Sequence, residues 1–303
     1  MLKARLLAGG CLGFAFIAGL YCDIRFKMDC CFLVFLTAGS AVVVYELYRL
    51  CTQRGLTPFI KFGIVMSVVL MLLRWLALQG TLPMLLKVES LPCWLVVLFP
   101  WAFRLGLATS VLGALWLQAT KRDNAATFES ISTTLFGLLY VVFLGGFMLD
   151  IRRLAADGVA GGAGWHAAGA LFLFSTVGVT KLCDVGAFTF GMLFGRHKLI
   201  PRISPKKTYE GAIGGLLFGV LIAVLFFEMG VFPLPNLASA LIFAVVISVV
   251  GQYGDLAESL LKRGSGMKDS GKIVPGFGGL LDVIDSLLVS APFAYVLLVI
   301  MLV

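Results

Sequence analysis

The sequence has few charged residues, no cysteines at C-x-x-C spacing and no internal repeats. Only 13% of its 303 residues are charged, whereas a soluble domain has about 25%. The seven cysteines are scattered without a C-x-x-C pair, so they indicate neither a zinc site nor a disulfide framework. We find no internal repeat, no low-complexity tract and no polar stretch large enough to fold as a separate soluble domain. These absences exclude an ordinary soluble enzyme.

Long apolar runs fill most of the chain, which is 60% hydrophobic. A membrane-spanning helix needs about 20 apolar residues, and we count about nine such runs. The predicted fold class is therefore all-α, a polytopic integral membrane protein with about nine transmembrane helices. The first run resembles a signal peptide but lacks an A-x-A-like cleavage site, so we expect it to be a retained span. The runs are 6–21, 31–50, 60–78, 93–117 (long, with Arg104 inside it, so a break or bend is expected), 131–149, 164–182, 212–227, 237–252 and 280–303.

Basic residues are distributed unevenly between the two sides of this map. With the N-terminus inside, most lysines and arginines fall in the inside segments, above all in 196–207 and 262–272. The positive-inside rule then predicts a cytoplasmic N-terminus and cytoplasmic motif loops, with the C-terminus outside. The same rule accounts for the net charge of +8, so no nucleic acid partner is expected.

The two halves of the chain differ in polarity. Few acidic groups lie at span depth before residue 164, whereas polar residues cluster after Lys181. We predict N-terminal scaffold helices over 1–163 and a catalytic region over 164–303, together forming a single membrane-embedded unit.

The end of the eighth run carries a polar stripe. Residues there recur at i, i+3, i+4 and i+7, the spacing of one helical face. The remaining faces are apolar. The stripe consists of Asp255, Glu258, Ser259 and Lys262.

The ninth run begins with a second acidic face, which holds Asp282, Asp285 and Ser286. An ionised side chain at mid-bilayer costs roughly 2.5–3.5 kcal/mol, so acids on neighbouring spans indicate a hydrated or metal-filled cavity. Oxygen ligands without histidine or cysteine suit a hard ion, Mg²⁺ or Mn²⁺. The alternative is a set of salt bridges to Lys262 and Arg263.

Between these spans lies a glycine-rich segment, 264–279, with Lys268 and Lys272 in it. Glycines let backbone N–H groups approach phosphate, and lysines supply positive charge; the alternative is a flexible turn. Gly266–Lys272 fits the pattern G-x-x-x-x-G-K of a Walker A loop. No strand precedes it and Ile273 replaces the required Ser or Thr, so we reject a P-loop.

A second polar cluster covers 181–215. Asp184 ends a span there, and Pro201 and Pro205 interrupt any helix in the basic segment that follows. Such a loop can bind a nucleotide triphosphate or anionic lipid headgroups, or it can serve only as a topology signal. Its basic residues are Arg196, His197, Lys198, Arg202, Lys206 and Lys207.

These two clusters resemble the motifs of one enzyme family. The segment 259–285 contains S-L-L-K-R and K-D-S-G-K-I-V-P-G-F-G-G-L-L-D-V-I-D, and the segment 184–211 contains D-V-G-A-F and F-G-R-H-K-L-I-P-R-I-S-P-K-K-T-Y-E-G. Both are similar to the signature blocks of phosphatidate cytidylyltransferases, also called CDP-diacylglycerol synthases. The resemblance covers about a third of the chain, and the N-terminal half matches only in being apolar.

The resemblance implies that CTP and phosphatidic acid react to give CDP-diacylglycerol and pyrophosphate. It also implies a two-metal centre with Mg²⁺ and a second ion such as K⁺, a location in the bacterial inner membrane among membrane lipids, and a homodimer. The implied catalytic residues are Asp255, Asp282, Asp285 and Lys262. Substrate phosphates would be bound by Ser259, Arg263, Lys268, Lys272, Lys206 and Lys207. The metal ligands and their supporting acids would be Asp255, Asp282, Asp285, Asp269 and Asp184.

Two departures from the family pattern lie in the second block, where Phe277 replaces a histidine and Val283 replaces an arginine. They leave an inactive homologue as one alternative. A CTP-dependent lipid or polyprenol kinase and a cation transporter are the others. Transporters carry repeats and acids deeper in their spans, and this sequence has neither.

Overall fold

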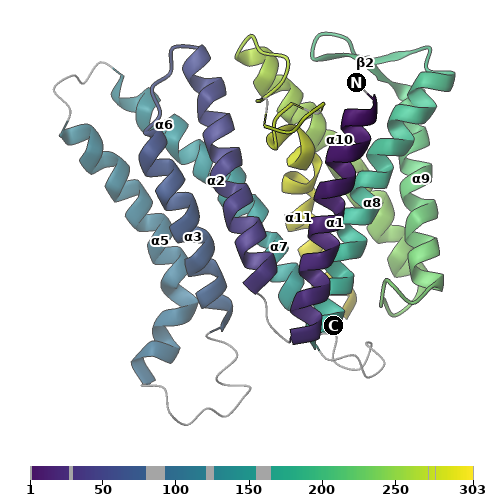
Figure 1. Ribbon diagram of the computed structural model, residues 1–303, viewed down its shortest axis with the longest axis horizontal. Coiled ribbons are helices and arrows are strands. Elements are labelled where there is room, and N and C mark those ends of the chain that lie inside the picture. Colours follow the sequence, from purple (N-terminus) through teal and green to yellow (C-terminus); the bar gives the residue numbers. More distant parts are fainter. Residues whose placement is uncertain are drawn as a thin grey trace. The chain divides into compact units, whose positions relative to one another are not determined.

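The computed structural model describes residues 2–26, 30–79, 93–120, 126–154, 165–271, 273–276 and 278–302 (Figure 1). Lys272 and Phe277 of the predicted site therefore lie outside the described residues. The chain forms α1 (Leu2–Phe26), α2 (Cys30–Gln53), α3 (Ile60–Gln79), α5 (Cys93–Ala119), α6 (Thr127–Gly137), η1 (Leu138–Phe143), α7 (Leu144–Arg153), α8 (Trp165–Phe194), β1 (Lys198–Ile200), β2 (Ser204–Thr208), α9 (Tyr209–Glu228), α10 (Leu237–Gly264) and α11 (Leu281–Leu302).

Nine helices in the described part of the chain are long and apolar enough to cross a membrane. This confirms the predicted fold class. The run with Arg104 is a continuous helix, in which the guanidinium carbon lies 4.7 Å from the centroid of the Trp101 ring. The fifth run is α6, η1 and α7 in succession, and its middle part has π-helical geometry.

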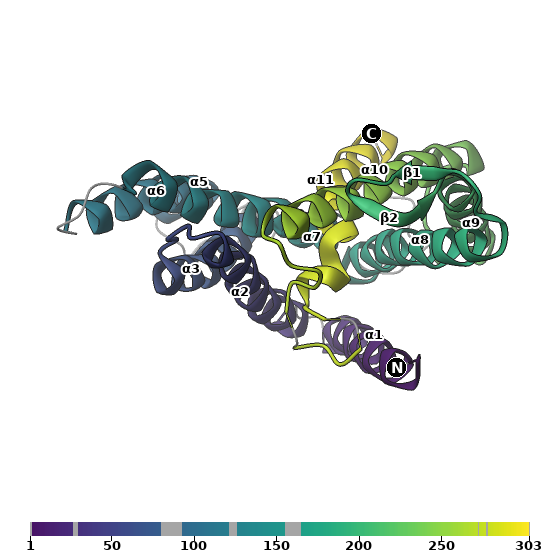
Figure 2. The same cartoon turned by 90° about the horizontal axis from the view of Figure 1, so that it is seen from above.

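The basic loop after α8 is a short antiparallel hairpin, in which Lys198 pairs with Thr208 and Ile200 with Ser204. Pro201 and Pro205 prevent a helix here, as predicted, but the strands were not expected. The hairpin lies across the ends of α8 and α9 (Figure 2). Strands of three and five residues are too short to produce a clear alternating pattern.

The chain folds into two compact units. The first comprises Met1–Gly19, Asp29–Leu149 and Ser270–Leu281, and the second comprises Leu20–Met28, Asp150–Asp269 and Asp282–Val303. These bounds describe packing and do not test the predicted division into scaffold helices over 1–163 and a catalytic region over 164–303, which stays a prediction.

In the first unit, α2, α3, α5 and α6 lie side by side (Figure 1, Figure 2). Tyr48 of α2 is fully buried, and its hydroxyl donates to the carbonyl of Thr134 at 2.7 Å. Its ring fills the space left by Gly63 and Gly137, where a Cβ would collide with it. Small residues that let large side chains and backbones approach are typical of packing between membrane helices.

In the second unit, α8 and α9 pack closely because glycines face each other. A Cβ at Gly215 would lie 2.9 Å from the carbonyl oxygen of Cys183, and one at Gly211 would lie 3.0 Å from the Cα of Gly191. Thr208 starts α9 as its N-cap, accepting a hydrogen bond from the N–H of Gly211 at 3.1 Å.

A similar close approach joins α10 to α11. A Cβ at Gly254 would lie 3.0 Å from the carbonyl oxygen of Asp285 and 3.1 Å from the Cα of Ser286. Because no side chain separates the two helices at this point, the acidic stripe on α10 lies directly against the acidic face of α11.

Candidate active site

The predicted acidic face of α10 is helical throughout, since the helix continues to Gly264. Asp255 is partly exposed, while Glu258, one turn further, is fully buried. Glu258 Oε2 lies 2.5 Å from the Lys262 Nζ, and Oε1 has no hydrogen-bond partner among the described residues. A buried carboxylate oxygen is stabilised by a partner, so a cation ligand would fit at this point.

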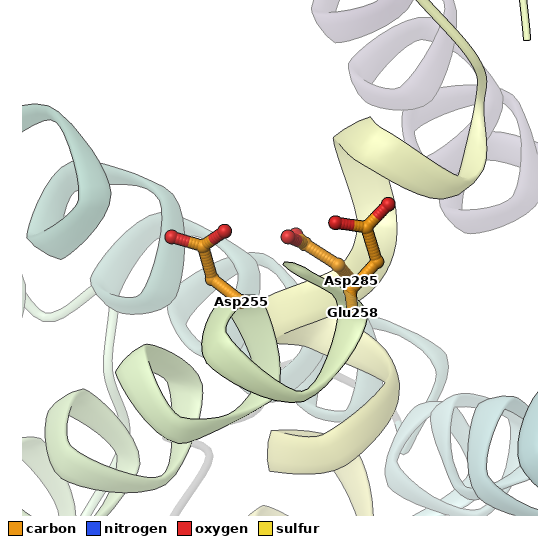
Figure 3. A group of neighbouring side chains, drawn as sticks. All are labelled: Asp255, Glu258 and Asp285. Carbon is orange, nitrogen blue, oxygen red and sulfur yellow. The ribbon is translucent and has the colours of Figure 1, made fainter. Parts of the chain in front are cut away.

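Asp285 of α11 completes a group of three carboxylates. Asp255, Glu258 and Asp285 each offer one oxygen, and these oxygens all lie within 4.8 Å of one another. Figure 3 shows the three side chains projecting from α10 and α11 toward the same side. We call these residues the acidic triad. Carboxylates at such distances repel one another unless a cation lies among them, so the triad can hold a divalent ion.

Lysines also pair with these acids. Lys262 bridges Glu258 and Asp282, with its Nζ 2.7 Å from Asp282 Oδ1. Lys207 of β2 lies 2.6 Å from Asp255 Oδ2. The salt bridges considered as the alternative to a metal site are therefore present, but they leave Glu258 Oε1 without a partner and do not separate the three carboxylates.

A third lysine connects the triad to α8. Lys181 Nζ lies 3.7 Å from Asp285 Oδ1 and 3.1 Å from Asp184 Oδ2, and it donates to the Ser286 hydroxyl at 2.6 Å. That hydroxyl donates in turn to Asp184 Oδ2 at 2.9 Å. Asp184 thus contacts the neighbours of the triad without belonging to it.

The structure brings only some of the predicted site residues together. Asp282, predicted as a metal ligand, is not one of the triad but the ion-pair partner of Lys262. Lys268 and Asp269 are exposed in the loop after α10, and Asp269 is not a member of the triad. Ser259 is half-buried on α10, and Val283 lies in the first turn of α11.

The basic hairpin contributes Lys207 directly and other groups at its edges. Lys206 is exposed, and Arg263 of α10 donates through Nε to the carbonyl of Ile203 at 3.3 Å. His197 pairs with Glu210 at 2.6 Å, and that carboxylate also accepts from the N–H of Arg196 at 3.1 Å. These contacts fix the hairpin to the start of α9 and the end of α10.

A cavity of about 170 Å³ opens beside the triad, among α8, the hairpin, α9 and α10. Small residues of α8 and α9, among them Gly191 and Gly211, form part of its wall. Charged groups and the exposed aromatic ring of Phe188 both line it. Its lining includes Asp184, Phe188, Lys207, Thr208, Gln252 and Asp255.

Three residues of this site were not predicted from the sequence as site residues: Glu258, Ser286 and Lys181. Glu258 and Ser286 had a signal, since both lie on the predicted polar faces of their helices. The sequence signal for Lys181 was weaker, since this residue is only the first basic residue of the polar second half. Sequence spacing shows which residues share a face, but it does not show which of them meet across two helices.

Comparison with known proteins extends the similarity over the whole chain. A sequence model of the Cytidylyltransferase family matches residues 3–301. The chain is 30% identical over 297 residues to the phosphatidate cytidylyltransferase of Bacillus subtilis, an alignment that covers 98% of this chain and 97% of that protein. It is 36% identical over 191 residues to the Thermotoga maritima protein of the same name (61% and 66% covered), and 28% identical over 289 residues to that of Synechocystis (88% and 89%).

Proposed function

The chain belongs to the cytidylyltransferase family, and we propose that it transfers the cytidylyl group of CTP to phosphatidic acid, forming CDP-diacylglycerol and pyrophosphate. The observation that carries this proposal is the acidic triad, which lies where two apolar helices meet and is surrounded by three lysines, with Glu258 and Asp285 buried and Asp255 partly exposed. Such a site combines what the reaction needs: a place for a divalent ion, positive charge for phosphates and access from the lipid phase.

Mg²⁺ is the proposed ion. Asp255, Glu258 and Asp285 fit it, because three carboxylate oxygens lie within 4.8 Å of one another and the Oε1 of Glu258 has no other described partner. When bound, Mg²⁺ neutralises triphosphate oxygens and stabilises the pyrophosphate leaving group. A second ion such as K⁺, and support of the site by Asp184 and Asp269, remain predictions.

The lysines around the triad would bind the phosphates. Lys207, Lys262 and Lys181 each pair with a carboxylate, so each ammonium group already lies within reach of the same point. We assign Asp282 the role of holding Lys262 in place from the opposite helix. Lys206, Arg263 and Lys268 would extend the positive surface outward from this point.

The chemistry needs no general base. A phosphate oxygen of phosphatidic acid is anionic at neutral pH, and it attacks the α-phosphorus of CTP in line. The new P–O bond forms as the bond between the α-phosphorus and the bridging oxygen breaks, and pyrophosphate leaves with that electron pair. The protein contributes orientation and positive charge.

The cavity beside the triad would receive part of the CTP. Its lining includes Lys207 and Asp255, so a phosphate bound by Lys207 would lie next to the proposed ion. Phe188 and Met192 of α8 are exposed apolar side chains on the same helix as Asp184. The acyl chains of the lipid substrate would approach along this face from the bilayer.

The remaining predictions concern placement. We propose that the hairpin and the loop 265–280 face the cytoplasm, where CTP is available. The hairpin joins the end of α8 to the start of α9, and the loop joins the end of α10 to the start of α11, so alternating spans place both on one side. The homodimer expected from the family remains a prediction.

Product analysis tests the proposed function. Purified protein is incubated with phosphatidic acid, Mg²⁺ and CTP labelled at either the α or the γ phosphate. We expect the α label to move into lipid and the γ label to appear in pyrophosphate. Transfer of the γ label to a lipid alcohol, with release of CDP, would indicate a kinase. Cation flux into sealed vesicles without cytidylated lipid would indicate a transporter.

A further inference from the structure

Glu46 is a buried carboxylate at the beginning of α11. It projects from α2 and is 1% exposed. The backbone N–H of Leu280 donates to its Oε1 at 3.1 Å, and that of Leu281 donates to its Oε2 at 2.8 Å. The Ser270 hydroxyl, 3.4 Å from Oε2, is a third donor. Both oxygens are thus used by the segment that leads into α11.

Two glycines allow this segment to surround the carboxylate. A Cβ at Gly279 would lie 2.6 Å from Glu46 Oε2, and one at Gly271 would lie 3.0 Å from its Cδ. Both distances are too short for ordinary van der Waals contact. At these two positions, glycine is therefore explained by contact with a protein carboxylate.

Glu46 acts on α11 as a cap supplied by another helix. The first N–H groups of a helix have no partner within it, and a negative charge at that end is favoured by the helix dipole. Because the donors are the N–H groups of Leu280 and Leu281, the cap determines where α11 begins. Asp282 follows immediately, and Asp285 lies one turn further.

We propose that Glu46 is a positioning residue for the carboxylates of α11. By accepting from the N–H groups of Leu280 and Leu281, it fixes the first turn of α11, which carries Asp282 and leads one turn further to Asp285. The inference rests on the proposed metal site but not on the identity of the lipid substrate. Glu46 is not a member of the acidic triad, and both of its oxygens accept hydrogen bonds from the loop and α11.

Direct ion binding tests this role. Mn²⁺ binding to the purified protein is measured by electron paramagnetic resonance without CTP or lipid, for the wild type and for Glu46→Gln. The amide keeps the size of the side chain, but its NH₂ group faces an N–H donor. We expect the half-saturating Mn²⁺ concentration to rise by about tenfold or more, the usual cost of losing a group that orients a metal ligand. Glu46→Asp, which keeps the charge, should give a smaller rise.

Tyr48→Phe is the matched control. Tyr48 lies two residues along the same helix, is fully buried and loses one hydrogen bond in the variant, to the Thr134 carbonyl. We expect it to lower thermal stability without changing Mn²⁺ affinity. Wild-type Mn²⁺ affinity in Glu46→Gln, or an equal loss of affinity in Tyr48→Phe, would overturn the positioning role.

If Glu46→Gln does not fold, a pair of glycine variants tests the positioning role of Glu46 instead. Gly279→Ala places a methyl group against the carboxylate, whereas Gly264→Ala, at the end of α10, meets no atom within 4 Å. Only the first should weaken Mn²⁺ binding, and equal affinities would contradict the proposal. The proposed function is tested separately from the role of Glu46. If the wild type binds Mn²⁺ but forms no cytidylated lipid, the proposed activity is refuted, while the Mn²⁺ affinities of the variants still decide the role of Glu46.

Discussion

Three buried serines of the first unit and Lys181 of the second unit find their hydrogen-bond partners in different ways. In the first unit, Ser40, Ser67 and Ser110 each donate to a carbonyl three residues earlier in their own helix, at 2.7–2.8 Å. In the second unit, Lys181 of α8 contacts Ser286 and Asp285 of α11. A hydroxyl that is satisfied within its helix places no constraint on other helices. Groups that need partners on several helices hold those helices in one arrangement, as a catalytic site requires.

Arg74 shows that a buried charge alone does not identify such a site. This side chain of the first unit is 6% exposed. Its guanidinium carbon lies 4.5 Å from the centroid of the Phe147 ring and 4.9 Å from that of Phe103, and Nη1 donates to the carbonyl of Phe143 at 3.1 Å. Aromatic rings and a backbone carbonyl account for this charge as part of the packing. What distinguishes the second unit is that several carboxylates converge on one point.

The largest effect is expected for Asp285→Asn. The amide keeps the volume of the side chain but removes one negative charge from the triad, so metal binding and turnover should both fail. We expect the rate of transfer from α-labelled CTP to lipid, per folded molecule, to drop by roughly 10²–10³-fold or more, and thermal unfolding without metal measures the folded fraction. Glu228→Gln, an exposed acid at the far end of α9, is the control. Turnover by Asp285→Asn within a few-fold of the wild type would contradict the proposed metal site.

Lys262→Met should come next. The substitution leaves Glu258, which is fully buried, and Asp282 without their shared cation. Removing one member of a buried ion pair costs about 3–5 kcal/mol in the free energy of unfolding, and the rate of transfer should fall as well. Unfolding by denaturing detergent and KM for CTP measure the two effects. Two variants serve as controls: Lys262→Arg, which keeps the charge, and Lys198→Met, at an exposed lysine of β1. If Lys262→Met had the same free energy of unfolding as Lys198→Met, the ion pair would not contribute to stability.

Much of this architecture could be predicted from the sequence. Long apolar runs specify spans because backbone polar groups in lipid must be satisfied within a helix. The i, i+3 spacing of Asp255 and Glu258 specifies a shared face once the helix is assumed, and α10 has that helix. Two prolines exclude a helix between α8 and α9, although they do not specify a hairpin.

The choice of partners could not be predicted in the same way. Asp282 and Glu258 both belong to acidic faces, but among the described residues it is Glu258 that joins Asp255 and Asp285 in the triad. Glu46 is a lone acid in an apolar run, without spacing or motif to distinguish it. Its role depends on residues more than 200 positions away, such as Leu280 at a separation of 234. Contacts of this kind arise from tertiary packing and leave no local pattern.

Arg74→Met tests whether the buried charge of the first unit serves packing and not catalysis. The loss of its hydrogen bond and of the contacts with aromatic rings should lower the free energy of unfolding by about 2 kcal/mol. Transfer per folded molecule should stay at the wild-type level, because the carboxylates of the second unit are unchanged. Thermal unfolding together with kcat measures both quantities. A fall in kcat with normal stability would instead assign Arg74 a part in the reaction.

The smallest effects come from a matched pair of buried serines, Ser67→Ala and Ser286→Ala. Both side chains are fully buried. Ser67 donates only to the carbonyl of Ile64, at 2.7 Å, so its loss should change stability by no more than about 0.5–1 kcal/mol and leave turnover unchanged. Ser286 bridges Lys181 and Asp184, and without it Lys181 loses an acceptor beside the triad. We expect Ser286→Ala to lower the rate of transfer about tenfold, equivalent to roughly 1.4 kcal/mol. If the two variants lost equal stability and equal turnover, a hydroxyl bonded within its helix and a hydroxyl bonded across helices would be equivalent, and the contrast between these two serines would fail.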